Sequence, residues 1–373
     1  MRAVKENTFF DKSKKIRLFI VRYFLCTFVT FIMVFLLLKF PSYSMAGVKN
    51  GMKICLESLI PSLYPFMILT NIYLSYEISG FMASAFDRIS RFVFRLPGST
   101  LPVILFSMIG GLPIGAKMSE ELYRKGIISK EQYARMICFC VNPGPAFVIS
   151  AVGVAMLGSE KTGILIYVSL IISSLVLGFA TRFFTSESET YIKQTARPET
   201  EAYSTSSIEQ AVVKSSKSIF AICAWVVAFS CLNELTLNMN LPEGMKTFIL
   251  CTSEITNGCV VASENFSAPI IASVIGFTGF CGHLQIIGQV KNSGIGYKYF
   301  LAGRIINSGL SAVVCSLLLK IFPVAKETFA LGNRPAAGDT SGSLMLSVLM
   351  IIMAMLFVIG DDYRVKRKNI KKV

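Results

Sequence analysis

Two charged residues lie beside breaks in otherwise apolar segments. Lys117 follows the break Gly110-Gly111-Leu112-Pro113, and Glu254 precedes the break Thr256-Asn257-Gly258. A lysine at the centre of a bilayer costs roughly 2.5–3.5 kcal/mol on insertion scales, so it needs a counter-charge or a water-filled cavity. We expect Lys117 and Glu254 to lie at similar membrane depth, where they pair or share a polar substrate. Two alternatives stay open: Lys117 reaches the cytoplasmic interface from a shallow hairpin, and Glu254 caps its own break or carries a proton.

Further polar residues stand at a second break in each half. In Asn142-Pro143-Gly144-Pro145 the prolines remove backbone donors and leave carbonyls free for a solute or ion. His283, the single histidine, could carry a proton, but a lone histidine is more often packed and hydrogen-bonded; Arg304 and Asn307 are its candidate partners or interfacial anchors. The predicted substrate-binding residues are Lys117, Asn142, Gly144, Glu254, Thr256, Asn257, His283 and Gln285, and the predicted hairpin-break residues are Gly110, Gly111, Pro113, Gly115 and Gly258.

Enzymatic and metal chemistry find no support in the motifs. The patterns HExxH, GxSxG and GxxxxGK[ST] are absent, so we assign no catalytic residue and no cofactor. The ten cysteines include no CxxC pair, and a second histidine is missing, so neither a disulfide framework nor a metal site is indicated. We expect a protein that is not an enzyme.

Composition places the chain in a membrane. It has 373 residues, of which 53% are hydrophobic and 16% are charged. Apolar runs such as 18–38, 164–184, 219–232 and 344–359 are near or above the length that crosses a bilayer. The net charge of +15 comes from basic residues at helix ends and tails, where membrane topology explains them better than nucleic acid does.

Charge and run lengths together predict a topology. Residues 1–45 are a basic N-terminus and first transmembrane helix, 46–185 and 214–325 are two repeats, 186–213 is a cytoplasmic linker, and 326–373 is a last transmembrane helix with a basic tail. Both termini are expected in the cytoplasm of a bacterial inner (cell) membrane, because basic flanks stay inside.

The two repeats are predicted to be inverted relative to each other. Segments 101–125 and 246–265 are each too short in their halves to span, so we expect re-entrant hairpins opening to opposite sides. A broken transmembrane helix follows each hairpin, interrupted at 142–145 and near Gly282. The predicted fold class is therefore an all-α polytopic membrane protein with an inverted repeat.

The first repeat carries motifs that resemble a known family. Gly111-Leu112-Pro113-x-Gly115-Ala116-Lys117, Leu122-Tyr123-x-Lys125-Gly126-x-Ile128-Ser129 and Asn142-x-Gly144-Pro145-x-Phe147 look like the nucleoside-recognition (Gate) domain, in its sporulation integral membrane protein branch. The resemblance covers roughly residues 50–325 and is weaker in the second half. It implies a fold distantly similar to concentrative nucleoside transporters, with two hairpins and two unwound helices around the site, and a link to spore formation.

Two functions follow from this reading. The first is a secondary transporter or solute-gating protein for a small polar solute such as a nucleoside. The alternative is a non-transporting scaffold or assembly factor in sporulation. A transporter would bring Lys117, Asn142, Glu254 and His283 to one wet cavity, whereas a scaffold would keep them apart or neutralised. Expected partners are membrane lipids, the solute and a coupling cation or proton, with a homo-oligomer left open and nucleic acid excluded.

Overall fold

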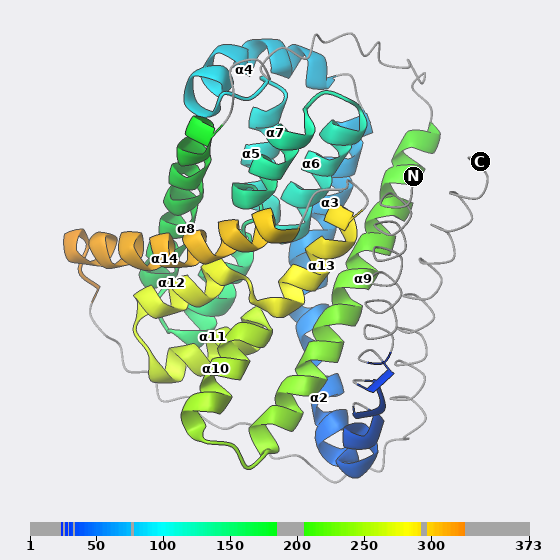
Figure 1. Cartoon of the computed structure of the whole chain (residues 1–373), viewed down its shortest axis with the longest axis vertical. Coiled ribbons are helices and arrows are strands. Elements are labelled where there is room, and N and C mark those ends of the chain that lie inside the picture. The colour runs from blue at the N-terminus through cyan, green and yellow to red at the C-terminus, as the bar shows by residue number, and fades with distance from the viewer. Residues whose placement is uncertain are drawn as a thin grey trace, which may run out of the picture. The chain divides into compact units, whose positions relative to one another are not determined.

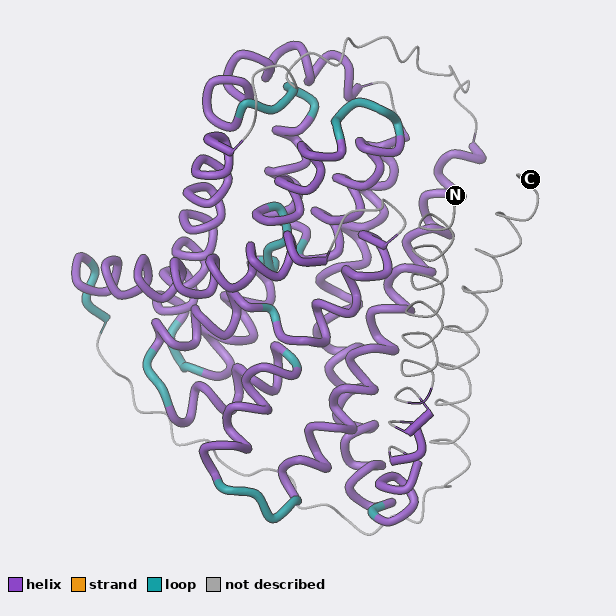
Figure 2. Tube along the Cα trace, in the orientation of Figure 1, coloured by secondary structure: helices purple, strands orange, loops and turns teal. Residues whose placement is uncertain are grey.

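The computed structural model describes residues 34–75, 78–184, 205–291 and 297–324, with a few positions between 24 and 32. All regular secondary structure in these residues is helical (Figures 1 and 2). The chain divides into two compact units, of which Val48–Ala336 contains all the predicted site residues. Most of the predicted first helix and linker, and all of the last helix and basic tail, lie outside the described residues.

Between Pro41 and Phe184, the described residues of the first half form α-helices, two π-helical segments and a 3₁₀ turn. They are α2 (Pro41–Ile54), the π-helical turn η1 (Cys55–Leu59), α3 (Ile60–Ser75), α4 (Ile78–Phe94), α5 (Thr100–Gly110), α6 (Leu112–Arg124), α7 (Lys130–Phe139), the π-helix η2 (Ala146–Met156), α8 (Glu160–Thr181) and the 3₁₀ turn η3 (Arg182–Phe184). The second half contains α9 (Thr205–Asn238), α10 (Glu243–Ser253), α11 (Ile255–Asn265), α12 (Ala268–Phe277), α13 (Gly279–Lys291) and α14 (Tyr297–Ile321).

Several described helices are long and apolar enough to cross a membrane. They are Glu160–Thr181, Ile208–Asn238, Ala268–Ile287 and Tyr297–Ile321, and a bent pair near the N-terminus would add a fifth. Each of the four has at least the roughly 20 residues that span a hydrocarbon core. The protein is an α-helical, multi-pass membrane protein, as composition predicted.

The first hairpin turns on one glycine. Gly111 joins α5 to α6 with φ of +88°, a backbone conformation that residues with a Cβ rarely adopt. Pro113 fits in the first turn of α6, where a missing N–H loses no helical hydrogen bond. The two arms pack against each other, so segment 101–125 is not one straight helix.

In the second hairpin, the turn residue is a glutamate whose carboxylate caps the following helix. Glu254 joins α10 to α11 in an extended conformation, with φ of −146°. Its side chain accepts hydrogen bonds from the backbone N–H groups of Thr256 and Asn257, both at 2.9 Å, and thereby caps α11. The arms again pack on each other. In Figure 1, α5 and α6 lie in the upper part of this unit and α10 and α11 in the lower part.

The helix after each hairpin is broken. Ser129 caps α7 with a capping box, α7 ends at Phe139, and the chain stays non-helical through Gly144. The break predicted near Gly282 is wrong by four residues, because α12 ends at Phe277. Thr278 and Gly279 both adopt positive φ, 70° and 65°, and this left-handed pair ends the helix, whereas Gly282 lies inside α13.

Two other boundaries differ from expectation. Helix α2 begins at Pro41 and runs across residue 45, where the sequence predicted the boundary between the first transmembrane helix and the first repeat. Helix α9 begins at Thr205, inside the predicted linker 186–213. Its serine-rich start resembles a loop, but Ala211 and Ser215 lie one turn apart and are both buried, which gives this stretch a packed helical face.

Both halves contribute to one hydrophobic core. Val148 and Val152 of η2 and Ile166 of α8 pack with Ile271 and Ile275 of α12, and all five side chains are fully buried. The core thus holds the broken helices of the two halves against each other and leaves their broken ends facing the same region.

Candidate functional site

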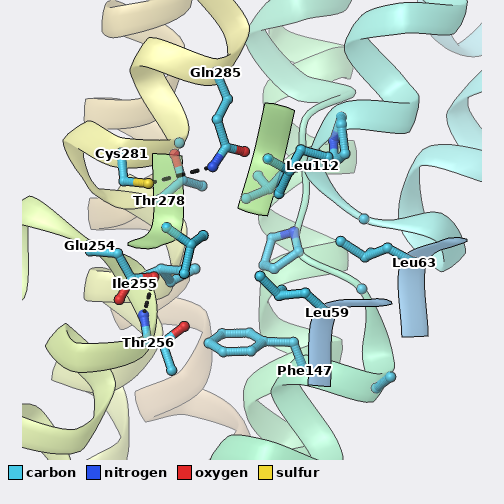
Figure 3. Close-up of a pocket in the computed structure, with 18 of the residues that line it drawn as sticks. Leu59, Leu63, Leu112, Phe147, Glu254, Ile255, Thr256, Thr278, Cys281 and Gln285 are labelled. Carbon is cyan, nitrogen blue, oxygen red and sulfur yellow. Dashed lines mark hydrogen bonds between the residues drawn. The ribbon is translucent and has the colours of Figure 1, made fainter. Parts of the chain in front are cut away.

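The hairpin turns and the helix breaks of both halves meet at one pocket (Figure 3). About 90 Å³ of space in it can be occupied by water-sized molecules, which is room for several waters or part of a small solute. The lining residues are Leu59, Leu63, Ile109, Gly111, Leu112, Pro113, Pro143, Gly144, Pro145, Ala146, Phe147, Ile222, Val226, Glu254, Ile255, Thr256, Thr278, Cys281, Gly282 and Gln285.

The second half supplies the polar wall of the pocket. Glu254 is the acidic residue among the described residues that line it, and it is 1% exposed. Thr256 adds a hydroxyl group, the Thr278 hydroxyl donates to the Phe277 carbonyl at 2.5 Å, and the Gln285 amide donates to the Cys281 sulfur at 3.4 Å. In Figure 3, Glu254, Thr278 and Cys281 lie together on one side of the pocket.

The first half supplies the apolar wall. Leu59 and Leu63 from η1 and α3 face the pocket with Leu112 of α6 and Phe147 of η2, opposite the polar side (Figure 3). Among the described residues on this wall, no side chain carries a charge. A ligand between the walls would meet aliphatic and aromatic carbon on one face and oxygen-bearing groups on the other.

Helix N-termini converge on the pocket. The first residues of α6, η2 and α11 line it, and α13 contributes Cys281 and Gly282 from its first turn. The first N–H groups of a helix have no intrahelical partner and carry a partial positive charge. The Glu254 carboxylate takes up this charge at α11. At α6, η2 and α13 the helix ends give the pocket a field that favours acceptor oxygens.

The sequence that forms these breaks and helices is similar to that of a known protein. The chain is 25% identical to the sporulation integral membrane protein YlbJ of Bacillus subtilis (strain 168). The alignment extends over 320 residues and covers 75% of this chain and 78% of the relative. No protein-family profile matches the chain, and no solved structure matches it. The homology is to an integral membrane protein, in agreement with the helices described above.

The predicted site residues divide into two groups. Gly144, Glu254, Thr256 and Gln285 line the pocket, as do the predicted break residues Gly111 and Pro113. The break residues Gly110, Gly115 and Gly258 pack behind it in the hairpins. Lys117, Asn142, Asn257 and His283 are not part of the lining. Asn257 adds its side-chain amide to the Glu254 carboxylate at 3.2 Å and so supports the cap from outside the pocket.

His283 holds the end of a broken helix. Its Nε2 lies 2.9 Å from the Phe277 carbonyl, the last of α12, and its Nδ1 contacts the Tyr297 hydroxyl. A carbonyl can only accept, so Nε2 carries the proton and Nδ1 accepts from Tyr297. The ring also packs edge-on against Phe300, at 5.0 Å between centroids. His283 therefore donates to a backbone carbonyl and packs among aromatic side chains. Its two ring nitrogens are occupied by Phe277 and Tyr297, so Arg304 and Asn307 are not its hydrogen-bond partners.

Arg304 does the same for the other broken helix, a role that the sequence analysis did not assign. Its guanidinium is fully buried and donates to the carbonyls of Val141 and Cys138, the latter at 2.7 Å. These carbonyls end α7, where cations are favoured by the helix dipole. An arginine in the middle of an apolar helix was the available signal, because such a charge needs a buried partner.

Asn142 closes a polar cluster next to that break. Its amide donates to the Phe139 carbonyl at 2.9 Å, and its oxygen accepts from Ser174 of α8 at 2.5 Å. Ser174 also lies 3.5 Å from the Asn307 oxygen. Asn142 therefore fixes the unwound segment and does not face the pocket.

Lys117 and Glu254 do not pair. The Lys117 ammonium donates to Ser218 of α9 at 3.2 Å, whereas the Glu254 carboxylate accepts three hydrogen bonds from the N-terminus of α11 and from the Asn257 side chain. Each charged group therefore has separate hydrogen-bond partners. In the structure Glu254 caps its own break, which was one of the alternatives left open by the sequence.

Proposed function

We propose that this protein is a solute-gating membrane protein or secondary transporter that binds a small polar solute in the pocket between its hairpin turns. One observation carries the proposal: the pocket is lined by matching positions from two halves of the chain. Transporters with inverted repeats place their solute at such a junction, between interrupted helices.

The match between the halves is close in its element bounds. α5 and α10 both have 11 residues and are followed by a one-residue break, Gly111 or Glu254. α7 and α12 both have 10 residues and end at Phe139 or Phe277. These agreements support a repeat of the order hairpin, broken helix, long helix.

The pocket uses the same positions of both halves. Gly111 and Glu254, the two hairpin turns, both line it. So do the fourth, fifth and eighth residues after Phe139 and Phe277, which are Pro143, Gly144 and Phe147 in the first half and Cys281, Gly282 and Gln285 in the second. A pocket on a pseudo-two-fold axis has this property.

Packing between the halves is reciprocal. α7 packs on α14 while α12 packs on α8, and α6 packs on α13 while α11 packs on η2. With α5 and α6 in the upper part of Figure 1 and α10 and α11 in the lower part, this packing supports an inverted repeat with two re-entrant hairpins. In this arrangement the hairpin turns are the gates, and rocking of one half against the other would expose the pocket to each side in turn.

The two walls define the class of solute. Helix N-termini and hydroxyl groups favour acceptor oxygens, and the leucines with Phe147 favour a flat apolar face. A small polar solute with a ring and several oxygens fits this description, and a nucleoside is one member of the class. Glu254 is the candidate for a coupling proton, because it is a buried carboxylate at the pocket.

We further propose that the protein acts during spore formation, in the bacterial cell membrane with both termini in the cytoplasm. The name of the Bacillus subtilis homologue supports the first part. The basic residues at both ends support the second.

Thermal unfolding of the purified full chain tests the pocket. We expect a solute from a panel of nucleosides, carboxylates and phosphates to raise the apparent Tm, because a ligand at 100 times its Kd stabilises by about 2.7 kcal/mol. Gln285→Leu should abolish the shift. Glu254→Gln should alter its pH dependence, whereas Glu264→Gln, an exposed carboxylate on the same helix, should not.

The second candidate is a non-transporting scaffold in sporulation. It is favoured by the fact that Lys117, Asn142 and His283 are satisfied within the protein and do not meet in a cavity. Complementation of a spore-forming host that lacks its own homologue separates the two. If Gln285→Leu and Glu254→Gln variants support sporulation as well as the parent, and no solute raises Tm, the scaffold is correct.

A further inference from the structure

Two cysteines that are 168 residues apart in the sequence meet where η1 packs against α9. The Cys55 thiol, at the start of η1, lies 3.7 Å from the backbone carbonyl oxygen of Cys223 in α9. The two thiol groups are close enough to interact with each other. Both are free thiols in the structure. The fold therefore brings together a cysteine pair that no CxxC spacing marks in the sequence.

Close packing of two helices produces this pair. At Gly51 of α2 the approach to α9 is so tight that an added Cβ would lie 2.7 Å from the Val227 Cα. Cys55 follows Gly51 by one turn, and Cys223 precedes Val227 by one turn, so the two helices run antiparallel along one line of contact. A disulfide needs Cα atoms within roughly 7 Å of each other, a spacing that antiparallel helices in backbone contact provide. Side-chain rotation can then join the two sulfur atoms.

The two thiols differ in their access to soluble reagents. Cys223 is half-buried, whereas Cys55 is 4% exposed. Lys53 and Glu57 flank Cys55 and form an ion pair at 4.0 Å, with side chains that are 67% and 66% exposed. Because charged side chains are costly in hydrocarbon, this ion pair indicates that η1 begins in contact with water. A reagent dissolved in water therefore meets Cys223 first, and Cys55 is the thiol behind it.

The pair lies at an edge of the pocket. Leu59, four residues after Cys55, lines the pocket (Figure 3), as do Ile222 and Val226 on either side of Cys223. Cys55 also begins a π-helical turn, a type of local irregularity that is frequent at functional sites. A covalent bond between the two cysteines would hold the pocket residues of η1 and α9 at one spacing.

We propose that Cys55 and Cys223 are a reversible redox pair, which a low-molecular-weight disulfide converts to an intramolecular disulfide that locks η1 to α9. The Cys223 thiol loses its proton, and its thiolate attacks the reagent disulfide, which forms a mixed disulfide and releases one reagent thiolate. The Cys55 thiolate then attacks the Cys223 sulfur, forms the protein S–S bond and releases the second reagent thiolate. The two protons lost by the protein end on the two released thiols, so two electrons pass from the protein to the reagent. Excess thiol reverses both steps.

Oxidation of the purified full-length protein with dipyridyl disulfide tests the pair, because each exchange step releases a thione that absorbs light. We expect a peptide cross-link between Cys55 and Cys223, identified by mass spectrometry, and its loss with dithiothreitol. Cys223→Ser should abolish the cross-link and leave Cys55 unmodified, because the buried thiol is reached only through Cys223. Cys55→Ser should abolish it and leave a pyridyl adduct on Cys223, because no second thiol resolves the mixed disulfide.

Hydrogen exchange measures the lock without any solute, so its outcome does not depend on the proposed function. Oxidation should slow exchange at residues 222–226 by about tenfold or more, because a disulfide opposes opening of the segments that it joins. The change should be absent from both serine variants. Cys138→Ser is the matched control: Cys138 is also half-buried, but its thiol donates to the Ala134 and Tyr299 carbonyls, both at 3.1 Å. This variant should form the cross-link and slow its exchange as the parent does.

Three outcomes would overturn the proposal. A folded parent that stays unreacted, or that carries separate adducts on Cys55 and Cys223 without a cross-link, would mean that the two sulfur atoms do not form a redox pair. Cross-links from Cys223 to Cys231 or Cys281 in equal yield would mean that the pairing is not selective. Unchanged exchange after complete cross-linking would mean that the bond does not lock η1 to α9.

Discussion

The two halves of the pocket occupy matching positions but carry different chemistry. Where the first half has Gly111 and Phe147, the second has Glu254 and Gln285. Backbone geometry at the hairpin turns differs for the same reason: a glycine turns with a positive φ, and a glutamate turns in an extended conformation by capping the next helix. The comparison teaches that one half forms an apolar wall, while the other holds the groups able to exchange protons or hydrogen bonds.

The broken helices are also held differently. Arg304, a permanent cation, binds two carbonyls at the end of α7, whereas His283, neutral in its observed contacts, binds one carbonyl at the end of α12. The first break is therefore fixed by more and stronger hydrogen bonds than the second. We infer that the second half is the more mobile one.

The largest expected effect comes from a glycine in the first hairpin. At Gly115 a Cβ would lie 1.6 Å from the Cys140 carbonyl oxygen, so Gly115→Ala must separate α6 from the end of α7. We expect a loss of more than about 3 kcal/mol, or no folded protein. At the matching Gly258 the closest atoms are 3.0 Å away, so Gly258→Ala should cost about 1 kcal/mol. Thermal unfolding of the two variants in detergent makes the comparison, and equal losses would contradict a tighter first half.

Next in size is removal of the groups that hold the breaks. Arg304→Met leaves two buried carbonyls without a donor, and we expect a loss of about 2–4 kcal/mol. His283→Phe removes one of the two donors to the Phe277 carbonyl, the other being the Thr278 hydroxyl, and should cost about 1 kcal/mol. Hydrogen exchange should show faster opening at 140–145 in the first variant and at 277–279 in the second. If exchange is unchanged at both breaks, these side chains do not hold them.

A smaller effect is expected at the cap of α11. Glu254→Ala removes the acceptor for two backbone N–H groups and should cost about 1 kcal/mol of stability. Glu254→Gln keeps one acceptor oxygen and should lose less. The difference in apparent Tm between the alanine and glutamine variants, measured without any solute, gives the contribution of the cap to stability. A larger loss for glutamine than for alanine would mean that the charge itself, and not the cap, is needed.

The smallest effect concerns coupling between Lys117 and Glu254. The two side chains share no partner, so the double variant Lys117→Gln with Glu254→Gln should lose the sum of the single losses to within about 0.5 kcal/mol. A double-mutant cycle on apparent unfolding free energies provides the measurement. A coupling above about 1 kcal/mol would restore the ion pair that the sequence suggested.

Local signals predicted most of the helical order. Gly111 with Pro113 and the prolines at 143 and 145 gave correct positions for the first hairpin and break, because each acts through its own backbone. The second break was misplaced at Gly282. The residue that ends α12 is Thr278, and a left-handed threonine has no strong sequence signature.

Part of the candidate site was also predicted, because the breaks could be recognised from local sequence. Glu254, Thr256, Gln285 and Gly144 lie at breaks, and the breaks do meet at the pocket. Lys117 and His283 also lie beside breaks, but their side chains point to Ser218 and Phe277. The position of a residue in the sequence predicts which break it lies beside. It does not predict on which face of the helix the residue finds its hydrogen-bond partner.

The sequence by itself determined that this is a multi-pass helical membrane protein with two interrupted segments in each half. Hydrophobic length and the conformational limits of glycine and proline act locally, so they can be read from neighbouring residues. Only the tertiary structure decided which polar groups face the pocket and which satisfy backbone. Arg304 reaches Cys138 and Val141 from a helix more than 160 residues away. In a medium without water every freed carbonyl must find a donor, and the packing of distant helices decides which donor it finds.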